Sequence, residues 1–274
     1  MTHISAIADE LALQPAGVQA TVDLLKLGAT IPFIARYRKE ATGSLDEVAI
    51  TTIRDRLNQL EELDARKASV LKSLETHGHL TAELKEKVLS APNMAQLEDI
   101  YLPYRPKRRT KATVARDKGL EPLALKIMEQ TGEDPFQLAA AFVEPEKEVT
   151  SPEDALEGAR HIMAEIINED PGARENLRDL YFHRGIIQSR VAPGKETEGA
   201  KYKDYFDWQE SVATAPSHRI LAMRRGENED ILNLTIAPSE EEAVALLETL
   251  FVKGDAADSM QVKLAVQDGY KRLL

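Results

Sequence analysis

Cysteine is absent from the chain of 274 residues, which excludes disulfide frameworks, thiol nucleophiles and cysteine-ligated zinc. Aromatic residues are scarce at 5%, while charged residues of both signs make up 30%, a composition typical of soluble, helix-rich proteins. Long apolar runs are also missing, since stretches such as 138–143 are far shorter than the roughly 20 residues that span a bilayer. The acids Asp9 and Glu10 stand where a signal peptide needs apolar residues. We therefore expect a cytoplasmic protein without membrane contact.

Positive charge is in deficit over the chain as a whole, which has a formal net charge of −11. Such acidity disfavours nucleic-acid binding by the entire surface, so any binding must be local and sensitive to salt. Residues 101–118 reverse the sign, because they carry seven cations and one acid for a net charge of +6. This reversal is typical of a surface that meets phosphates or an acidic partner. The alternative is that neighbouring acidic helices neutralise the segment.

The basic residues of this segment are the predicted phosphate contacts, since guanidinium groups bind phosphate oxygens through paired hydrogen bonds and lysines supply a point charge. They are Arg105, Lys107, Arg108, Arg109, Lys111 and Arg116. Pro103 and Pro106 are expected to interrupt helix and to hold the chain extended, so that these side chains point outward. Tyr101 and Tyr104 are expected either to stack on a ligand or to anchor the segment.

Helix signals are dense in the first two thirds of the sequence and predict a mainly α fold, with a multi-helical domain over residues 1–185. Ser44 and Glu47 have the spacing of a capping box, in which each side chain bonds the backbone N–H of the other residue. Apolar residues then recur every three or four positions to about Glu75, which predicts a long central helix of about 45 Å. Later helices are expected to begin after three capping residues, Thr81, Ser151 and Asp170.

The pattern of the sequence changes after Gly185 from helix signals to short, strand-like segments. Residues 186–274 are predicted to form a small mixed α/β region that leads to a further domain beyond the chain. Residues 186–191 and 231–237 are short and rich in β-branched side chains, so each predicts a strand. Between them, four aromatic residues crowd into positions 202–208. This crowding indicates a docking edge or a small core, with a stacking platform as the alternative.

A helix-turn-helix-like element is predicted at the end of the basic segment. Thr110 is expected to cap a short helix that ends at Gly119, and the next helix begins near Pro122. Ala115, Gly119 and Leu125 have the spacing of a helix-turn-helix, in which small residues let two helices pack closely. Any short helical hairpin needs similar residues, and the second helix offers few side chains that could read bases. We therefore do not expect sequence-specific recognition.

Residues 28–43 form a second basic element, in which Arg36, Arg38 and Lys39 follow an apolar stretch. These three residues either reinforce phosphate binding or brace neighbouring carboxylates on a helix whose apolar side is core. Residues 217–226 are a third and weaker case, because arginines at a helix C-terminus are explained by compensation of the helix dipole.

Catalytic signatures are incomplete throughout the sequence. Gly194 and Lys195 are followed by Glu196 rather than Ser or Thr, so the chain has no phosphate-binding P-loop. Neither G-x-G-x-x-G nor G-x-S-x-G occurs. His161 and Glu165 lie one helical turn apart, but no second ligand pair accompanies them as a metal site requires. We therefore expect a protein that is not an enzyme and that needs no cofactor.

Three segments carry a resemblance to a known family: GATIPFIARYRKEATGSLDE, LEDIYLPYRPKRRTKATVARDKGLEPLA, and KYKDYFDW followed by PSHRILAMRRGE. In this order they resemble the bacterial Tex proteins, the transcription accessory family. The resemblance implies a mostly helical N-terminal portion with a helix-turn-helix-like element, and nucleic-acid binding with little sequence preference. It also implies a relationship to a eukaryotic transcription elongation factor that binds histones and polymerase. Family members continue into an RNase-H-like domain, helix-hairpin-helix repeats and an S1 domain, which is regarded as the main nucleic-acid contact.

The function predicted from these observations is a non-catalytic module that contacts the phosphates of RNA or DNA without sequence preference. RNA polymerase and associated transcription factors are candidate partners. The rival hypothesis is a protein-interaction scaffold, in which the same basic segment binds an acidic surface of the RNA polymerase machinery or of a later domain of its own chain. The net charge of −17 outside residues 101–118 repels nucleic acid and favours this rival.

Overall fold

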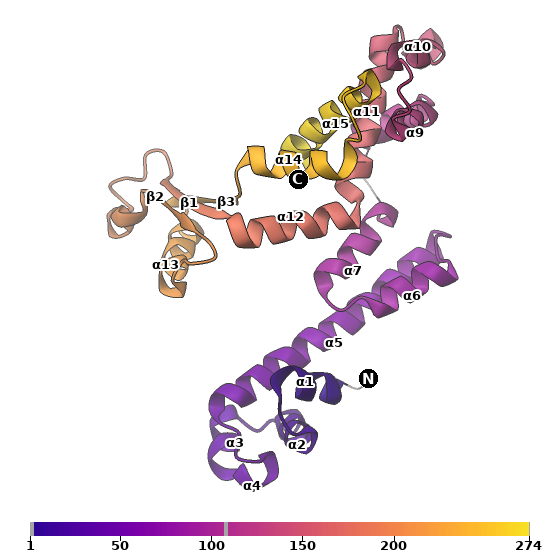
Figure 1. Ribbon diagram of the computed structural model, residues 1–274. Helices are drawn as coiled ribbons and strands as arrows, with labels where there is room; N and C mark the ends of the chain where they lie inside the picture. Colours follow the sequence, from indigo (N-terminus) through magenta and orange to yellow (C-terminus); the bar gives the residue numbers. More distant parts are fainter. Residues whose placement is uncertain (1–2, 107–108, 274) are drawn as a thin grey trace. The chain divides into compact units, whose positions relative to one another are not determined.

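The computed structural model describes residues 3–106 and 109–273, and its elements are mainly helices (Figure 1). They form two compact units, Met1–Tyr104 and Arg105–Leu274, which we call unit 1 and unit 2. A mainly α fold with a small mixed region near its C-terminal end was predicted and is confirmed. Within the two described ranges, no helix is long and apolar enough to cross a membrane.

Unit 1 is built of helices around one long central helix. The helices are α1 (His3–Leu11), α2 (Pro15–Lys26), α3 (Ile31–Tyr37), α4 (Lys39–Thr42), α5 (Glu47–Thr76), α6 (Ala82–Ser90), α7 (Met94–Tyr101) and the 3-10 helix η1 (Leu102–Tyr104). The 30 residues of α5 confirm the predicted long helix. Figure 1 shows α1 to α4 around one end of α5, and α6 and α7 near its other end.

The start of α5 differs from the predicted capping box. The helix follows Asp46, whose carboxylate accepts a hydrogen bond of 2.8 Å from the Ala49 N–H. The capping role predicted for Ser44 is therefore wrong, and Ser44 lies in a turn with φ of 65°. Asp46 suits the position because its charge also meets the positive end of the helix dipole. The predicted cap of α6 is confirmed, since Thr81 accepts a hydrogen bond of 3.1 Å from the Leu84 N–H.

The apolar face of α5 contributes to separate cores along its length. Its first half buries Ile50 against α3 and Ile53 against α1 and α2. Its second half buries Val70 and Leu74 against α6 and α7. Because each half contacts different helices, α5 is the element that connects the parts of unit 1.

Unit 2 contains further helices and a small sheet. The helices are α8 (Lys111–Asp117), α9 (Glu121–Glu129), α10 (Pro135–Ala140), η2 (Pro145–Lys147), α11 (Pro152–Glu169), α12 (Pro171–Arg184), η3 (Ala200–Tyr205), α13 (Ser217–Asn228), α14 (Glu240–Phe251) and α15 (Ala257–Leu273). The strands are β1 (Ile186–Val191), β2 (Asp207–Ser211) and β3 (Leu232–Ala237). The predicted caps of α11 and α12 are confirmed, since the side chains of Ser151 and Asp170 accept from the N–H groups of Asp154 and Ala173.

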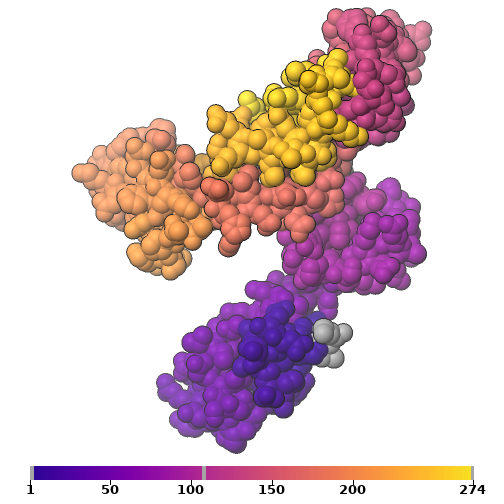
Figure 2. Space-filling model, viewed as in Figure 1, coloured from indigo at the N-terminus to yellow at the C-terminus, as the bar shows by residue number. Residues whose placement is uncertain are grey.

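The core of unit 2 is built around α11, which packs against α8, α9, α10 and α15. Ile162, Met163 and Ile167 of α11 are fully buried. Helices α14 and α15 add apolar side chains to the same core, and Figure 2 shows their yellow surface against that of α12. The division predicted at residue 185 stays a prediction, and helices from both sides of that position share this core.

The sheet has the strand order β2-β1-β3 and is antiparallel throughout. Strands β1 and β3 were predicted, whereas β2 was not. Trp208 of β2 lies opposite Ser189 of β1. The aromatic crowding before β2 contributes to a small core, in which Tyr202 is buried with Ile231 and Leu232. The small-core interpretation is therefore confirmed.

Candidate nucleic-acid interface

The basic segment begins at an anchored tyrosine. Tyr101 is buried, shares a hydrogen bond of 2.8 Å with Ser73 of α5, and lies beneath the guanidinium of Arg66. Anchoring, rather than stacking on a ligand, is thus the role of Tyr101. The expectation of extended chain at Pro103 is wrong, because residues 102–104 form the helical turn η1 directly after α7.

The exposed cations of the segment are Arg105, Arg109 and Lys111. None of the three takes part in an ion pair with another residue of the described ranges. Lys107 and Arg108, also predicted as phosphate contacts, lie outside the described residues. These three cations are therefore exposed and unpaired within the described ranges, and their role as phosphate contacts stays a prediction.

Helix α8 holds the last of these cations in place. Thr110 caps the helix as predicted, because its hydroxyl accepts a hydrogen bond of 3.0 Å from the Thr113 N–H. Ala112 and Ala115 are buried, so one face of this short helix is fixed against α11. Lys111, the first helical residue, is exposed beside the cap.

Arg116 has internal partners instead of a free guanidinium. It donates to Glu121 at 2.9 Å and also pairs with the buried carboxylate of Glu165, which lies within reach of the Thr110 hydroxyl at 3.5 Å. Both hydrogen bonds raise the pKa of Arg116 against the opposing effect of burial. The contact with Glu165 joins α8 to α11, so we assign Arg116 to the packing of unit 2. Lys118 is similarly engaged, at 3.3 Å from the Glu148 carboxylate.

A surface cavity of about 610 Å³ lies between α8 and α11. Arg109, Lys111 and Lys118 line one part of it, and the acids Glu148, Asp154 and Glu157 line another. Apolar lining comes from Val114, Ala115, Leu120 and Val149. The mixed sign of this lining means that phosphate binding is favoured at the cationic rim and opposed at the acidic one.

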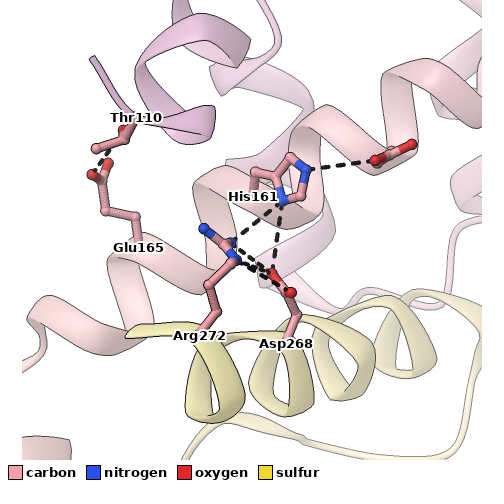
Figure 3. A network of polar contacts seen from close by, with 6 residues as sticks. Thr110, His161, Glu165, Asp268 and Arg272 are labelled. Carbon is pink, nitrogen blue, oxygen red and sulfur yellow. Dashed lines mark hydrogen bonds and ion pairs between the residues drawn. The ribbon is translucent and has the colours of Figure 1, made fainter. Parts of the chain in front are cut away.

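The pair His161 and Glu165 does not converge on a metal site (Figure 3). The imidazole lies 3.6 Å from Glu157 and 3.7 Å from Asp268, whereas Glu165 is directed to α8. Arg272 donates to Asp268 at 2.6 Å and completes the network. Among the described residues, no group of three or more His, Asp or Glu side chains could hold a metal ion.

The position of His161 gives the stability of unit 2 a defined pH dependence. Burial, Arg272 and Lys111 lower the pKa of His161 from 6.5, against the opposing effect of Asp268 and Glu157. Below pH 6.5, therefore, His161 is protonated more readily in the unfolded chain than in the folded chain. We expect stability to fall as the pH drops from 6.5 towards the lowered folded value, by no more than about 1.4 kcal/mol for each pH unit from this group.

The measurement is the free energy of unfolding by denaturant at about pH 7.5 and about pH 5.5. His161→Gln is expected to show a smaller loss between the two than the wild type, and His183→Gln, on the exposed side of α12, controls for removal of a histidine. An equal loss in wild type and His161→Gln would contradict this account.

The segment predicted to be helix-turn-helix-like folds as α8, α9 and a turn in which Gly119 has φ of 82°. Ala115 is buried as predicted, but Leu125 is 52% exposed, and Leu123 makes the buried contact instead. On the outer side of α9, Lys126 pairs with Glu133 at 2.8 Å. The absence of sequence-specific recognition stays a prediction.

The second basic element lies in unit 1, on α3 and α4. The side chain of Arg36 is 69% exposed, and its nearest carboxylate, Glu47, is 3.9 Å away. Arg38 lies over the ring of Phe33 at 5.5 Å from the centroid, and Lys39 is exposed. All three cations are exposed, and whether they bind phosphates or brace carboxylates stays open. The sequence gave no sign that Phe33 is exposed beside them.

The third basic element is engaged internally. Arg219 pairs with Glu210 and lies over the Trp208 ring at 4.9 Å from its centroid. Arg224 pairs with Glu227 one turn further along α13. Because these arginines have internal partners, residues 217–226 are a weaker candidate for a ligand site than the other two basic elements.

Comparison with known proteins gives two matches to family models. The family model described as "Tex-like protein N-terminal domain" matches residues 1–75, and the model described as "Tex central region-like" matches residues 130–268. The chain is 41% identical to the uncharacterized protein YdcI of Bacillus subtilis over 98% of its length. It is 44% identical to the transcriptional accessory protein Tex of Neisseria gonorrhoeae over 84% of its length, and 28% identical to the S1 RNA-binding domain-containing protein 1 of Pongo abelii over 86%. It spans 38%, 30% and 24% of these relatives, respectively.

Proposed function

Because this chain belongs to the Tex family, we propose that it is a non-catalytic module of a transcription accessory protein, which binds the phosphates of RNA or DNA without sequence preference. The names of two relatives, a transcriptional accessory protein and an S1 RNA-binding domain-containing protein, support this assignment. The contacts we assign to unit 2 are Arg105, Lys107, Arg108, Arg109 and Lys111. Arg36, Arg38 and Lys39 reinforce binding from unit 1.

The observation that carries the proposal is the availability of the cations around position 109. Arg105, Arg109 and Lys111 are exposed, while the chain supplies carboxylates to Arg116 and Lys118 only a few residues further on. Side chains that are already paired gain little from an added phosphate, whereas unpaired ones release counterions when they bind it. We leave Arg116 out of the contact set for this reason.

Binding of the 274-residue chain to labelled RNA and DNA at several salt concentrations tests the proposal. If the five contacts of unit 2 each neutralise one phosphate, they alone predict a slope of log affinity against log salt of about −3.5 for single strands and about −4.5 for duplex DNA. Each contact added from unit 1 steepens the slope by about 0.7 to 0.9. Oligonucleotides of unrelated sequence are expected to bind with similar affinity. Affinity that is independent of salt, or that depends strongly on sequence, would contradict the proposal.

A further inference from the structure

Two aromatic side chains are exposed on α3, where the apolar pattern of the sequence suggested core. The helix buries Ile34 and Ala35 in unit 1 and leaves Phe33 and Tyr37, four residues apart, 40% and 66% exposed. The ring centroids of Phe33 and Tyr37 are 5.5 Å apart, with a tilt of 43° between the rings. Phe33 therefore supports the Tyr37 ring from one side, while much of Tyr37 faces solvent.

Three cations accompany this pair of rings. Arg38 lies over Phe33 in a cation–π contact, and Arg36 and Lys39 are exposed on the same short stretch of chain. Glu40 is the single acid among residues 28–43, so the stretch is locally positive within an acidic protein. Exposed aromatic rings beside arginine and lysine form the combination on which unpaired bases stack while their phosphates are neutralised.

We propose that Tyr37, supported by Phe33, is a stacking platform for an unpaired base of single-stranded RNA or DNA. Arg36, Arg38 and Lys39 neutralise the phosphates that flank this base. The proposal rests on the proposed function and adds its substrate class, which is single strands rather than duplexes. In a duplex, each internal base is stacked on both faces, so the tyrosine ring has no free base to contact. A protein partner would also bury the two rings, but the three cations around them favour a polyanion.

Tyr37→Ala in the 274-residue chain tests the platform, with labelled oligouridine, oligothymidine and duplex DNA as probes. Loss of one stacked base is expected to weaken binding of the single strands by about 5- to 150-fold. The salt slope is expected to stay unchanged because no charge is removed, and duplex affinity is expected to stay unchanged as well. Tyr37→Phe keeps the ring and is expected to bind within about twofold of the wild type. The two single-stranded probes show whether RNA or DNA is preferred.

Phe182→Ala is the matched control, since Phe182 is also 66% exposed and has a neighbouring ring, His183, at 5.1 Å. Its single-strand affinity is expected to equal that of the wild type. If the alanine variant at position 37 fails to fold, Tyr37→Leu removes the aromatic face while keeping an apolar contact with Phe33.

The outcomes separate the platform from the proposed function. Salt-dependent binding by the wild type that Tyr37→Ala leaves intact would overturn the platform and leave the proposed function standing. Loss of polymerase binding in Tyr37→Ala, with oligouridine and oligothymidine affinities intact, would assign the ring pair to a protein partner and overturn the platform. Absence of nucleic-acid binding by the wild type at any salt concentration would overturn both.

Discussion

Replacement of Lys107, Arg108 and Arg109 by alanine is expected to weaken nucleic-acid binding by about 100-fold at about 0.1 M salt. Each of the three residues is assigned to one phosphate, and each neutralised phosphate contributes about 0.7 to 0.9 to the salt slope. The slope should therefore flatten by about two units. Affinities measured by fluorescence anisotropy across a series of salt concentrations give both quantities.

A variant of equal charge controls for the change in net charge. Lys26, Lys85 and Lys203 are exposed, lie outside the basic elements, and form no ion pair with the described residues. Their joint replacement by alanine is expected to change the slope by less than about half a unit. Equal slopes for the wild type and the variant at positions 107 to 109 would remove these residues from the interface.

Arg116→Met is expected to lower the free energy of unfolding by about 2–3 kcal/mol and to leave the salt slope unchanged. The substitution removes the Arg116 guanidinium from the buried carboxylate of Glu165. Removal of one partner from a fully buried pair costs about 3–5 kcal/mol, and the 29% exposure of the Arg116 side chain reduces this cost. Denaturant unfolding followed by circular dichroism measures it.

The double variant Arg116→Met with Glu165→Met is expected to lose less stability than Arg116→Met alone, because the buried carboxylate that faced Arg116 is then removed as well. Arg54→Met is the control, since Arg54 pairs with Asp55 on the exposed surface of α5, where such pairs contribute about 0–1 kcal/mol. Arg116→Met within about 0.5 kcal/mol of the wild type would contradict the packing role. If the salt slope of Arg116→Met is flatter than that of the wild type by about one unit, Arg116 contacts a phosphate after all.

The parts of the fold that follow from short-range chemistry were predictable from the sequence. Thr81, Ser151 and Asp170 cap helices because their side chains reach N–H groups only three residues away. Strand β2 was missed because its ladder depends on distant partners, such as Ser211 opposite Ile186. Prediction from neighbouring residues failed at the start of α5. Ser44 and Asp46 could each cap this helix, and in the structure Asp46 does so.

The sequence predicted where positive charge is concentrated in the candidate interface, but it could not show which of those side chains have internal partners. The sequence places Arg109 and Arg116 in the same basic segment, but only the fold brings Glu165, 49 residues away, to Arg116. The exposed ring of Tyr37 was missed for a related reason. An apolar stretch shows that one helix face is buried, and the packing against α5 decides which face that is.

Photocrosslinking to RNA that contains 4-thiouridine tests the central claim most directly, because it identifies the residues in contact. Cleavage after glutamate releases residues 99–129 as one peptide, since the bond between Glu121 and Pro122 resists cleavage and Glu129 is the next glutamate. The account predicts crosslinks within residues 105–111 of this peptide, with fewer at high salt. Crosslinks confined to other peptides, with this one unmodified at low salt, would contradict it.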